Sequence, residues 1–320
     1  MNIAITGGGG FLGRMLAKEL LSRPGIARLV LADMVPVAGL ADDPRVATVA
    51  GDLGQPGAAA AVVEGMDAVF HLAAVLSGQS ETDFDLGMRI NVDATRCLLE
   101  AARAGGRRPR FVFTSSLAVY GPPLPPIVTE GTALRPQSSY GAGKAIAELL
   151  VADYSRRGYV DGRVLRLPTI CVRPGKPNSA TSSFVSGIIR EPLQGRAAVC
   201  PVSPDLELWL SSPRTAVRNL AHGGFLEANA LGTNRILNVP GISVTVAEMI
   251  GSLRRTAGAE VAARVSFAED SLVRRIVSSW PARFDVSRAL GLGFVGDGGF
   301  EDLIAQFSAH LAAERAAERP

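Results

Sequence analysis

The sequence has few of the residues that build disulfide frameworks or metal sites. Among its 320 residues are three cysteines and three histidines. Cys97, Cys171 and Cys200 are widely spaced and odd in number, which indicates buried free thiols in a reducing compartment. The histidines do not recur at the spacing of metal ligands, so we predict no bound metal.

Long apolar runs and a strong excess of one charge are also missing. No stretch is apolar over the length that spans a bilayer, and no basic segment followed by an apolar one resembles a secretory signal. The formal net charge is +3, and the arginine pairs at 107–108 and 156–157 are isolated. We therefore expect a soluble cytoplasmic protein that binds neither nucleic acid nor membranes. A hydrophobic content of 47% is enough for a large core.

A glycine-rich turn separates a predicted buried strand at 2–6 from a predicted helix at 11–22. Gly7, Gly10 and Gly13 follow the strand with the spacing G-x-x-G-x-x-G. Glycines at such a turn allow the backbone to approach a diphosphate, whose charge is favoured at the N-terminus of a helix. The turn therefore predicts a dinucleotide site, and the alternative is a tight strand-to-helix turn without a ligand.

A second predicted strand, at 27–33, ends at Asp33. An acidic residue at this place meets the ribose hydroxyls of the adenosine. No basic residue follows Asp33 closely, so we expect NAD rather than NADP. An aspartate at the end of a strand also caps ordinary turns and helices, and this interpretation stays open.

Tyr140 and Lys144 are four residues apart at the start of a predicted helix, so they share one face of it. An ammonium group beside Tyr140 would lower its pKa from about 10 toward neutrality. The phenolate would then be a general base for an alcohol. Ser116, at the end of a predicted strand, is placed to hydrogen-bond the same oxygen. A Tyr-x-x-x-Lys pattern is common by chance. It indicates a catalytic pair here because a predicted nucleotide-binding turn precedes it.

Strands and helices alternate along the chain, which predicts an α/β fold with a Rossmann-type doubly wound parallel sheet. The predicted strands are at 2–6, 27–33, 46–52, 67–73, 110–116, 162–169 and 235–239, and the clearest helices at 11–22, 88–105 and 140–157. Prolines and glycines interrupt this rhythm after about residue 170. We predict an NAD-binding domain from 1–170 and 214–241, and a smaller C-terminal substrate lobe from 171–213 and 242–320.

The sequence resembles the extended short-chain dehydrogenase/reductase family over essentially its whole length. The motifs that carry the resemblance are TGGGGFLG at 6–13, GDL at 51–53, HLAA at 71–74, SSLAVYG at 115–121 and YGAGK at 140–144. It implies that Ser116, Tyr140 and Lys144 are catalytic and that His71 is structural. It also implies a cofactor site made of Gly7, Gly10, Phe11, Leu12, Gly13, Asp33, Asp52, Leu53, Leu72, Ala73, Ala74, Asn91, Tyr140, Lys144, Pro168 and Ile170. Relatives pair the helices near 88–105 and 140–157, so we expect a homodimer.

The segment after the predicted sixth strand bears on the substrate, because sugar-nucleotide enzymes of the family usually carry an asparagine there. This chain has RLPTI at 166–170 instead. The string at 166–178 resembles family members that use NAD to oxidise the C2 hydroxyl of a small four-carbon sugar acid. The carboxylate of such an acid needs a cation, for which Arg173, Lys176 and Arg214 are candidates. The predicted substrate residues are Ser77, Ser116, Thr169, Arg173, Asn178, Ser182 and Arg214.

Three alternatives to a sugar-acid dehydrogenase stay open. A nucleotide-sugar 4-epimerase would use the same catalytic residues and keep its NAD bound through turnover. A threonine 3-dehydrogenase-like enzyme would need a carboxylate for the ammonium group of its substrate. A non-catalytic NAD-binding regulator usually lacks the tyrosine or the lysine, and both are present here.

Overall fold

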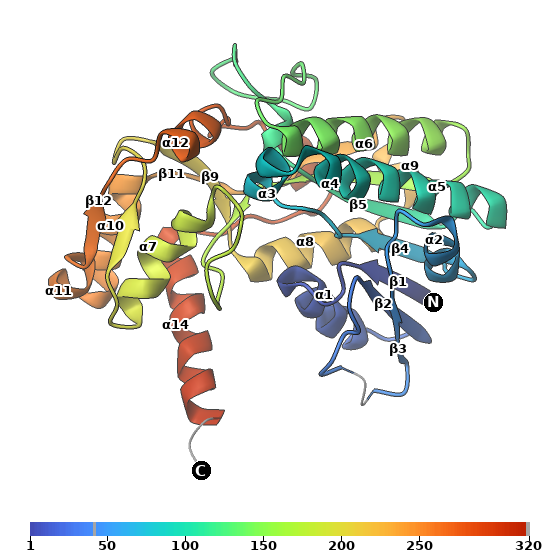
Figure 1. Cartoon of the computed structure of the whole chain (residues 1–320), viewed down its shortest axis with the longest axis horizontal. Coiled ribbons are helices and arrows are strands. Elements are labelled where there is room, and N and C mark those ends of the chain that lie inside the picture. The colour runs from blue at the N-terminus through green and yellow to red at the C-terminus, as the bar shows by residue number, and fades with distance from the viewer. Residues whose placement is uncertain (41–42, 318–320) are drawn as a thin grey trace.

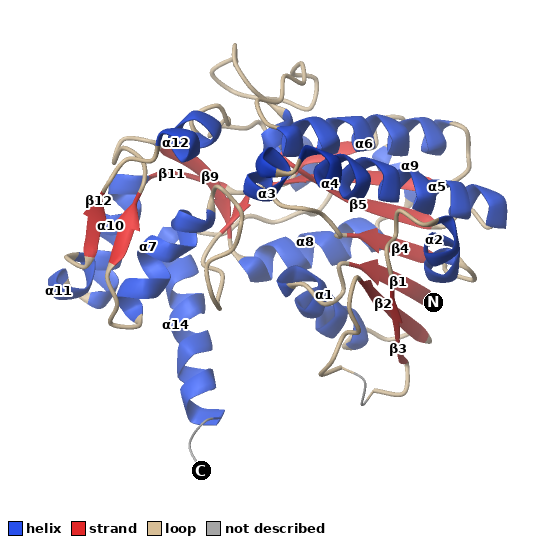
Figure 2. Ribbon diagram, viewed as in Figure 1, coloured by secondary structure: helices blue, strands red, loops and turns tan. Residues whose placement is uncertain are grey.

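The computed structural model describes residues 1–40 and 43–317, so positions 41–42 and 318–320 of the predicted domains lie outside it. Its centre is a seven-stranded parallel sheet of order β10-β6-β5-β4-β1-β2-β3, with helices on both faces (Figure 1, Figure 2). Its strands are β1 (Asn2–Thr6), β2 (Arg28–Asp33), β3 (Val46–Ala50), β4 (Ala68–His71), β5 (Arg110–Ser116), β6 (Asp161–Leu167) and β10 (Ile236–Asn238). The predicted Rossmann-type α/β fold is therefore confirmed.

The two faces of the sheet bury alternate side chains of its strands. Ile3 and Ile5 of β1 point to one face and Ala4 to the other, as expected for a strand that is covered on both sides. The first face is covered by α1 (Phe11–Leu21) and α8 (Pro213–Phe225). The second face is covered by α2 (Pro56–Val63), α5 (Ala94–Gly105) and α6 (Ser139–Arg156). The short helices that connect these elements are α3 (Ser77–Thr82), α4 (Phe84–Met88), α9 (Ala228–Leu231), α13 (Ser287–Gly291) and a 3-10 turn at Leu117–Val119.

A third hydrophobic core is built from the segments after residue 170. Its strands form two small sheets, β11-β9-β7 and β12-β8, made of β7 (Thr169–Ile170), β8 (Ala198–Cys200), β9 (Glu207–Ser211), β11 (Ile242–Thr245) and β12 (Val265–Phe267). Its helices are α7 (Ser183–Leu193), α10 (Val246–Ala257), α11 (Ala259–Ala262), α12 (Ser271–Val277) and α14 (Phe300–Ala317). A separate core is compatible with a smaller lobe, and the predicted domain bounds stay a prediction. In the described part of the chain, no helix combines the length and apolar character that crossing a membrane requires.

Two predicted elements are interrupted in the structure. The strand expected at 162–169 ends at Leu167, and Pro168 separates it from β7, which joins another sheet. Proline has no N–H to donate to a strand ladder, which explains the break. The helix expected at 88–105 begins earlier, at Phe84, and passes through a π-helical turn at Arg89–Asp93. Such turns are frequent at functional sites.

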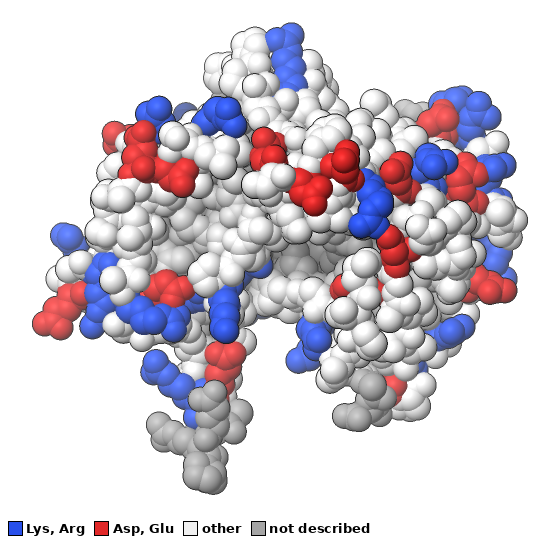
Figure 3. Space-filling view, in the orientation of Figure 1, with Lys and Arg blue, Asp and Glu red and all other residues white. Residues whose placement is uncertain are grey.

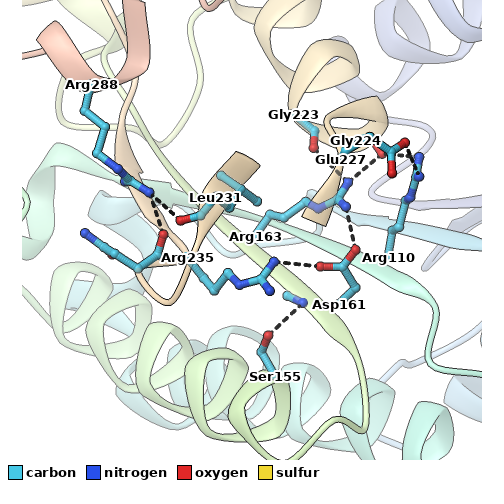
Figure 4. A network of polar contacts seen from close by, with 12 residues as sticks. Arg110, Ser155, Asp161, Arg163, Gly223, Gly224, Glu227, Leu231, Arg235 and Arg288 are labelled. Carbon is cyan, nitrogen blue, oxygen red and sulfur yellow. Dashed lines mark hydrogen bonds and ion pairs between the residues drawn. The ribbon is translucent and has the colours of Figure 1, made fainter. Parts of the chain in front are cut away.

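An arginine network at the amino ends of β5 and β6 fixes α8 against the sheet (Figure 4). Arg163 is almost completely buried and donates to the carbonyls of Gly223 and Gly224, in the last turn of α8, at 3.0 and 2.7 Å. A cation at the C-terminal end of a helix interacts favourably with its dipole. Asp161 accepts from both Arg163 and Arg235 (Figure 4). The C-terminal end of α8 is thereby held at the amino ends of β5 and β6, on the side of the sheet opposite to the carboxyl ends of the strands.

Candidate active site

A cleft of about 650 Å³ follows the carboxyl ends of the central strands and extends to the smaller lobe. Figure 3 shows the surface hollowed near the middle of this face. Open α/β sheets bind their ligands at this edge. The predicted residues that line the cleft are Gly7, Gly10, Phe11, Leu12, Gly13, Asp33, Leu53, Leu72, Ala73, Ala74, Ser77, Ser116, Tyr140, Lys144, Pro168, Thr169, Ile170, Arg173, Asn178 and Ser182.

Three predicted site residues are not among the described residues that line the cleft. Arg214 is exposed in the first turn of α8, outside the described lining of the cleft, which argues against its assignment to the substrate. Asn91 is buried in the π-helical turn, where its amide bonds both the N–H and the carbonyl of Val75 at 2.9 and 3.1 Å. Asp52 forms an ion pair with Arg89, which does line the cleft. Asn91 and Asp52 thus support segments of the wall.

The glycine turn between β1 and α1 has the close packing that a dinucleotide site requires. Gly7 has a φ of +68°, and a Cβ atom there would meet the backbone nitrogen of Ala73 at 2.8 Å. A Cβ atom at Gly13 would lie 2.1 Å from the carbonyl oxygen of Gly7. Within the described residues, no side chain caps the first turn of α1. Its free N–H groups fit a diphosphate, so the residues present fit NAD.

The start of α6 places Tyr140 and Lys144 beside Ser116. Ser138 caps the helix by accepting from the N–H of Gly141 at 3.1 Å. A Cβ atom at Gly141 would lie 2.1 Å from the carbonyl oxygen of Ala118, so only glycine lets the helix approach the turn after β5 so closely. The hydroxyl oxygen of Ser116 accepts from the N–H of Ala118 at 3.2 Å. Its hydroxyl hydrogen remains available to a substrate oxygen.

The pKa values of Tyr140 and Lys144 differ from those that their four-residue spacing predicts. The ammonium of Lys144 donates to the carbonyl of Thr114 at 2.8 Å and lies 5.7 Å from the centroid of the Tyr140 ring. Burial raises the pKa of Tyr140 to about 12, while the neighbouring Ser116 hydroxyl acts in the opposite direction. Burial also lowers the pKa of Lys144 to about 7, against the attraction of Glu148. Desolvation of the buried phenol, and not the charge of Lys144, therefore determines the pKa of Tyr140 in this arrangement.

A buried ion pair holds α6 to the sheet one turn beyond Lys144. Glu148 is fully buried and accepts from Nε and Nη2 of Arg166, on β6, at 2.9 and 2.6 Å. Ser115 donates to the same carboxylate. This pair was not predicted from the sequence, although Glu148 lies four residues after Lys144 and therefore on the same face of the helix.

His71 is a structural residue in this arrangement. It is completely buried, and its ring nitrogens contact the hydroxyls of Thr6 and Thr95 at 2.6 and 2.9 Å. Burial lowers its pKa to about 3. Across residues 1–40 and 43–317, no three His, Cys, Asp or Glu side chains are grouped so that they could hold a metal ion.

The segment after β7 is fastened over the cleft through Ser77. The hydroxyl oxygen of Ser77 accepts from the N–H of Thr181 at 3.0 Å and lies 3.1 Å from the hydroxyl oxygen of Thr181. Gly78 donates to the carbonyl of Ser179 at 2.9 Å, and a Cβ atom there would lie 2.3 Å from that oxygen. Ser77 therefore lines the cleft while its hydroxyl is engaged with Thr181.

Cations dominate the charged lining of the cleft. Asp33 is the single carboxylate among its described lining residues, whereas the cations are Arg89, Lys144, Arg173, Lys176 and Arg190. Two lining residues from the smaller lobe, Arg190 on α7 and Trp280, were not predicted from the sequence. A signal for Arg190 was its place in the otherwise largely apolar run SFVSGIIREPL. The cleft is suited to anionic ligands.

Comparison with known proteins agrees with this geometry. Residues 3–223 match the family model described as the NAD dependent epimerase/dehydratase family. The chain is 56% identical over 317 residues to the D-erythronate dehydrogenase of Cupriavidus necator, covering 96% of this chain and 98% of the relative. It is 48% identical to that of Haemophilus influenzae, with coverage of 96% and 98%. The structure of a nucleoside-diphosphate-sugar epimerase from Agrobacterium tumefaciens superposes with a TM-score of 0.90 and 43% identity, covering 95% of this chain and 92% of that one.

Proposed function

The chain belongs to the NAD dependent epimerase/dehydratase family, and we propose that it oxidises the C2 hydroxyl of D-erythronate to 2-dehydro-D-erythronate. It is an NAD-dependent dehydrogenase. The observation that carries the choice of substrate is that Ser116, Tyr140 and Lys144 share one cleft with the guanidinium group of Arg173. A hydroxyl to be deprotonated and a carboxylate to be bound are the two groups that a 2-hydroxy acid offers.

The glycine turn and Asp33 would hold NAD, which accepts a hydride from C2 when it is bound. Tyr140, as phenolate, takes the proton of the C2 hydroxyl. The hydroxyl hydrogen of Ser116 bonds the same oxygen, because the Ser116 oxygen already accepts from the Ala118 N–H. Lys144 donates to the carbonyl of Thr114 and lies 5.7 Å from the centroid of the Tyr140 ring, so in its protonated form it favours the phenolate by its charge.

The charge of the cleft weighs against a threonine dehydrogenase. The ammonium group of threonine would need a carboxylate near the catalytic residues. In the described lining that carboxylate is limited to Asp33, whose Oδ2 accepts from the N–H of Gly9 in the nucleotide turn at 2.9 Å.

The proposed reaction is tested by NADH formation with D-erythronate, other four- and five-carbon aldonates and L-threonine. UDP-glucose is tested by its conversion to the C4 epimer, because an epimerase releases no NADH. We expect D-erythronate to have the highest kcat/KM. A UDP-sugar or threonine with a higher kcat/KM than every aldonate would overturn the assignment.

Asp33→Ala should weaken NAD binding more than NADP binding. The carboxylate of Asp33 repels a 2′-phosphate in the parent and accepts from ribose hydroxyls in NAD. Arg14 donates to the carbonyl of Gly9 at 2.9 Å, and the N–H of Gly9 donates to Asp33. Arg14 is thus held on the same turn, and its charge favours the phosphate once the carboxylate is gone. Fluorescence titration with NADH and NADPH gives both dissociation constants. A parent that already prefers NADPH would contradict this role of Asp33.

We further propose a homodimer in which α4 and α6 form the interface. Phe84 on α4 and Ile146 and Leu149 on α6 are 59%, 39% and 67% exposed, and the two helices are neighbours (Figure 1). Light scattering of the parent at micromolar concentration should give twice the mass of one chain. Leu149→Glu should give a monomer, whereas the control Leu290→Glu, at a position 51% exposed on α13, should stay dimeric. A monomeric parent would contradict the proposal.

The cytoplasmic location stays a prediction.

A further inference from the structure

Two arginine side chains of the smaller lobe border the cleft with donors that lack acceptors. Arg190 is 2% exposed, and within residues 1–40 and 43–317 its Nη2 has no hydrogen-bond partner. Oε1 of Glu191 lies 2.7 Å from this nitrogen, in an ion pair without hydrogen-bond geometry. Nε of Arg173 is likewise buried and unpaired in that part of the chain. A buried donor without an acceptor is costly, which indicates an acceptor supplied by a ligand.

The charges around Arg190 are unbalanced. Glu191 accepts from Nε of Arg190 at 2.8 Å, and it also accepts from Nε of Arg196 at 2.7 Å. Burial lowers the pKa of Arg173, and the positive charge of Arg190 lowers it further. Glu191 thus pairs with both Arg190 and Arg196, and no carboxylate in the described chain pairs with Arg173. A bound anion would reduce this repulsion.

The helix that carries Arg190 also fixes the backbone of Arg173. Nη1 of Arg190 donates to the carbonyl of Arg173 at 2.9 Å. The N–H of Arg173 donates to the hydroxyl of Ser186, one turn earlier on α7, at 3.0 Å. Both guanidinium groups therefore reach the cleft from one rigid support, as a preformed anion site requires.

We propose that Arg190 and Arg173 together bind the carboxylate of the substrate. The inference rests on the proposed function, because it takes the ligand to be a small hydroxy acid. A planar guanidinium pairs with a carboxylate through parallel hydrogen bonds, and a second one adds charged donors that bind an anionic carboxylate more strongly than the neutral hydroxyls of a polyol. The pair would thus select acids over uncharged sugars of the same length.

The diphosphate of the cofactor is the other anion to consider. The guanidinium carbon of Arg173 lies 5.8 Å from the centroid of the Phe11 ring, and Phe11 is the first residue of α1. Arg173 is therefore also close to the expected diphosphate site. In the described chain, no hydrogen bond or ion pair links Arg190 to the glycine turn. Arg190 is accordingly the residue that distinguishes the two anions.

The experiment compares Arg190→Gln and Arg190→Lys with the parent. The matched control is Arg196→Gln, which removes the more exposed partner of the same Glu191. Steady-state kinetics with D-erythronate, calorimetric binding of D-erythronate to the enzyme–NADH complex, NADH titration and thermal unfolding are measured for each. We expect Arg190→Gln to raise KM and Kd for D-erythronate about 10- to 100-fold, with NADH affinity changed less than about threefold. Arg190→Lys should lie between, because it keeps the charge without the fork.

Each outcome bears on the proposal. Parental D-erythronate binding in both Arg190 variants would overturn it, and so would NADH binding that falls as much as D-erythronate binding. If Arg190→Gln does not fold, Arg190→Lys decides. A parent that binds D-erythronate without oxidising it would overturn the proposed function alone, since the binding comparison still tests the arginine pair. A parent that neither binds nor oxidises it would overturn both.

Discussion

Tyr140→Phe should fold, bind NADH as the parent does and lose most of its turnover. The variant lacks only the phenolic oxygen, which is the proposed proton acceptor. General base catalysis contributes about 10²- to 10⁴-fold in typical enzymes, and we expect kcat with D-erythronate to fall by that factor. Steady-state kinetics measure the loss, while NADH titration and thermal unfolding verify that the site and the fold are intact.

The pH dependence gives this prediction a second readout. A base must lose its own proton before it can accept another, and burial raises the pKa of Tyr140 to about 12. The phenolate fraction therefore rises with pH, but Lys144, whose pKa burial lowers to about 7, loses its charge above neutral pH. We therefore expect kcat of the parent to rise with pH up to about 7 and to level off above it. In Tyr140→Phe this increase should be absent. A variant with near-parental turnover, or with the parental pH profile, would contradict the assigned role.

The local parts of the site could be predicted from the sequence. The glycine turn is a continuous segment, and the spacing of Tyr140 and Lys144 places both on one face as soon as a helix forms. Ser116 was found because it ends a strand. The spacing does not determine in which direction the Lys144 ammonium points. It bonds the carbonyl of Thr114, on a strand 30 positions earlier, so the effect on the pKa of Tyr140 differs from the expectation.

The smaller lobe was harder to predict, because its side chains reach the cleft through long-range packing. Arg190 could not be assigned from its neighbours in sequence, since only the docking of α7 brings it beside Arg173. Arg214 was chosen as a basic residue near the expected lobe, but it is the second residue of α8 and is exposed. Pro168 ended the predicted strand early and directed the chain into a second sheet.

Arg173→Ala should lower kcat/KM for D-erythronate by about 10²-fold, whereas Arg214→Ala should keep the parental value. A carboxylate loses water on binding and needs a charged donor in return. Removing that donor costs up to about 3 kcal/mol, which corresponds to that factor. Arg214 is the matched control, because it has the same side chain and was a candidate in the same sequence analysis. Parental kinetics in Arg173→Ala would show that the carboxylate is bound elsewhere.

The double variant Arg173→Ala with Arg190→Gln tests whether the two arginines bind one group. Residues that share a partner are coupled, so the loss in the double variant should be smaller than the product of the two single losses. Additive losses in free energy would indicate separate ligands, with Arg173 on the diphosphate near Phe11. NADH affinity decides that case directly. It should barely change in Arg173→Ala if the carboxylate is the ligand, and it should fall with kcat/KM if the diphosphate is.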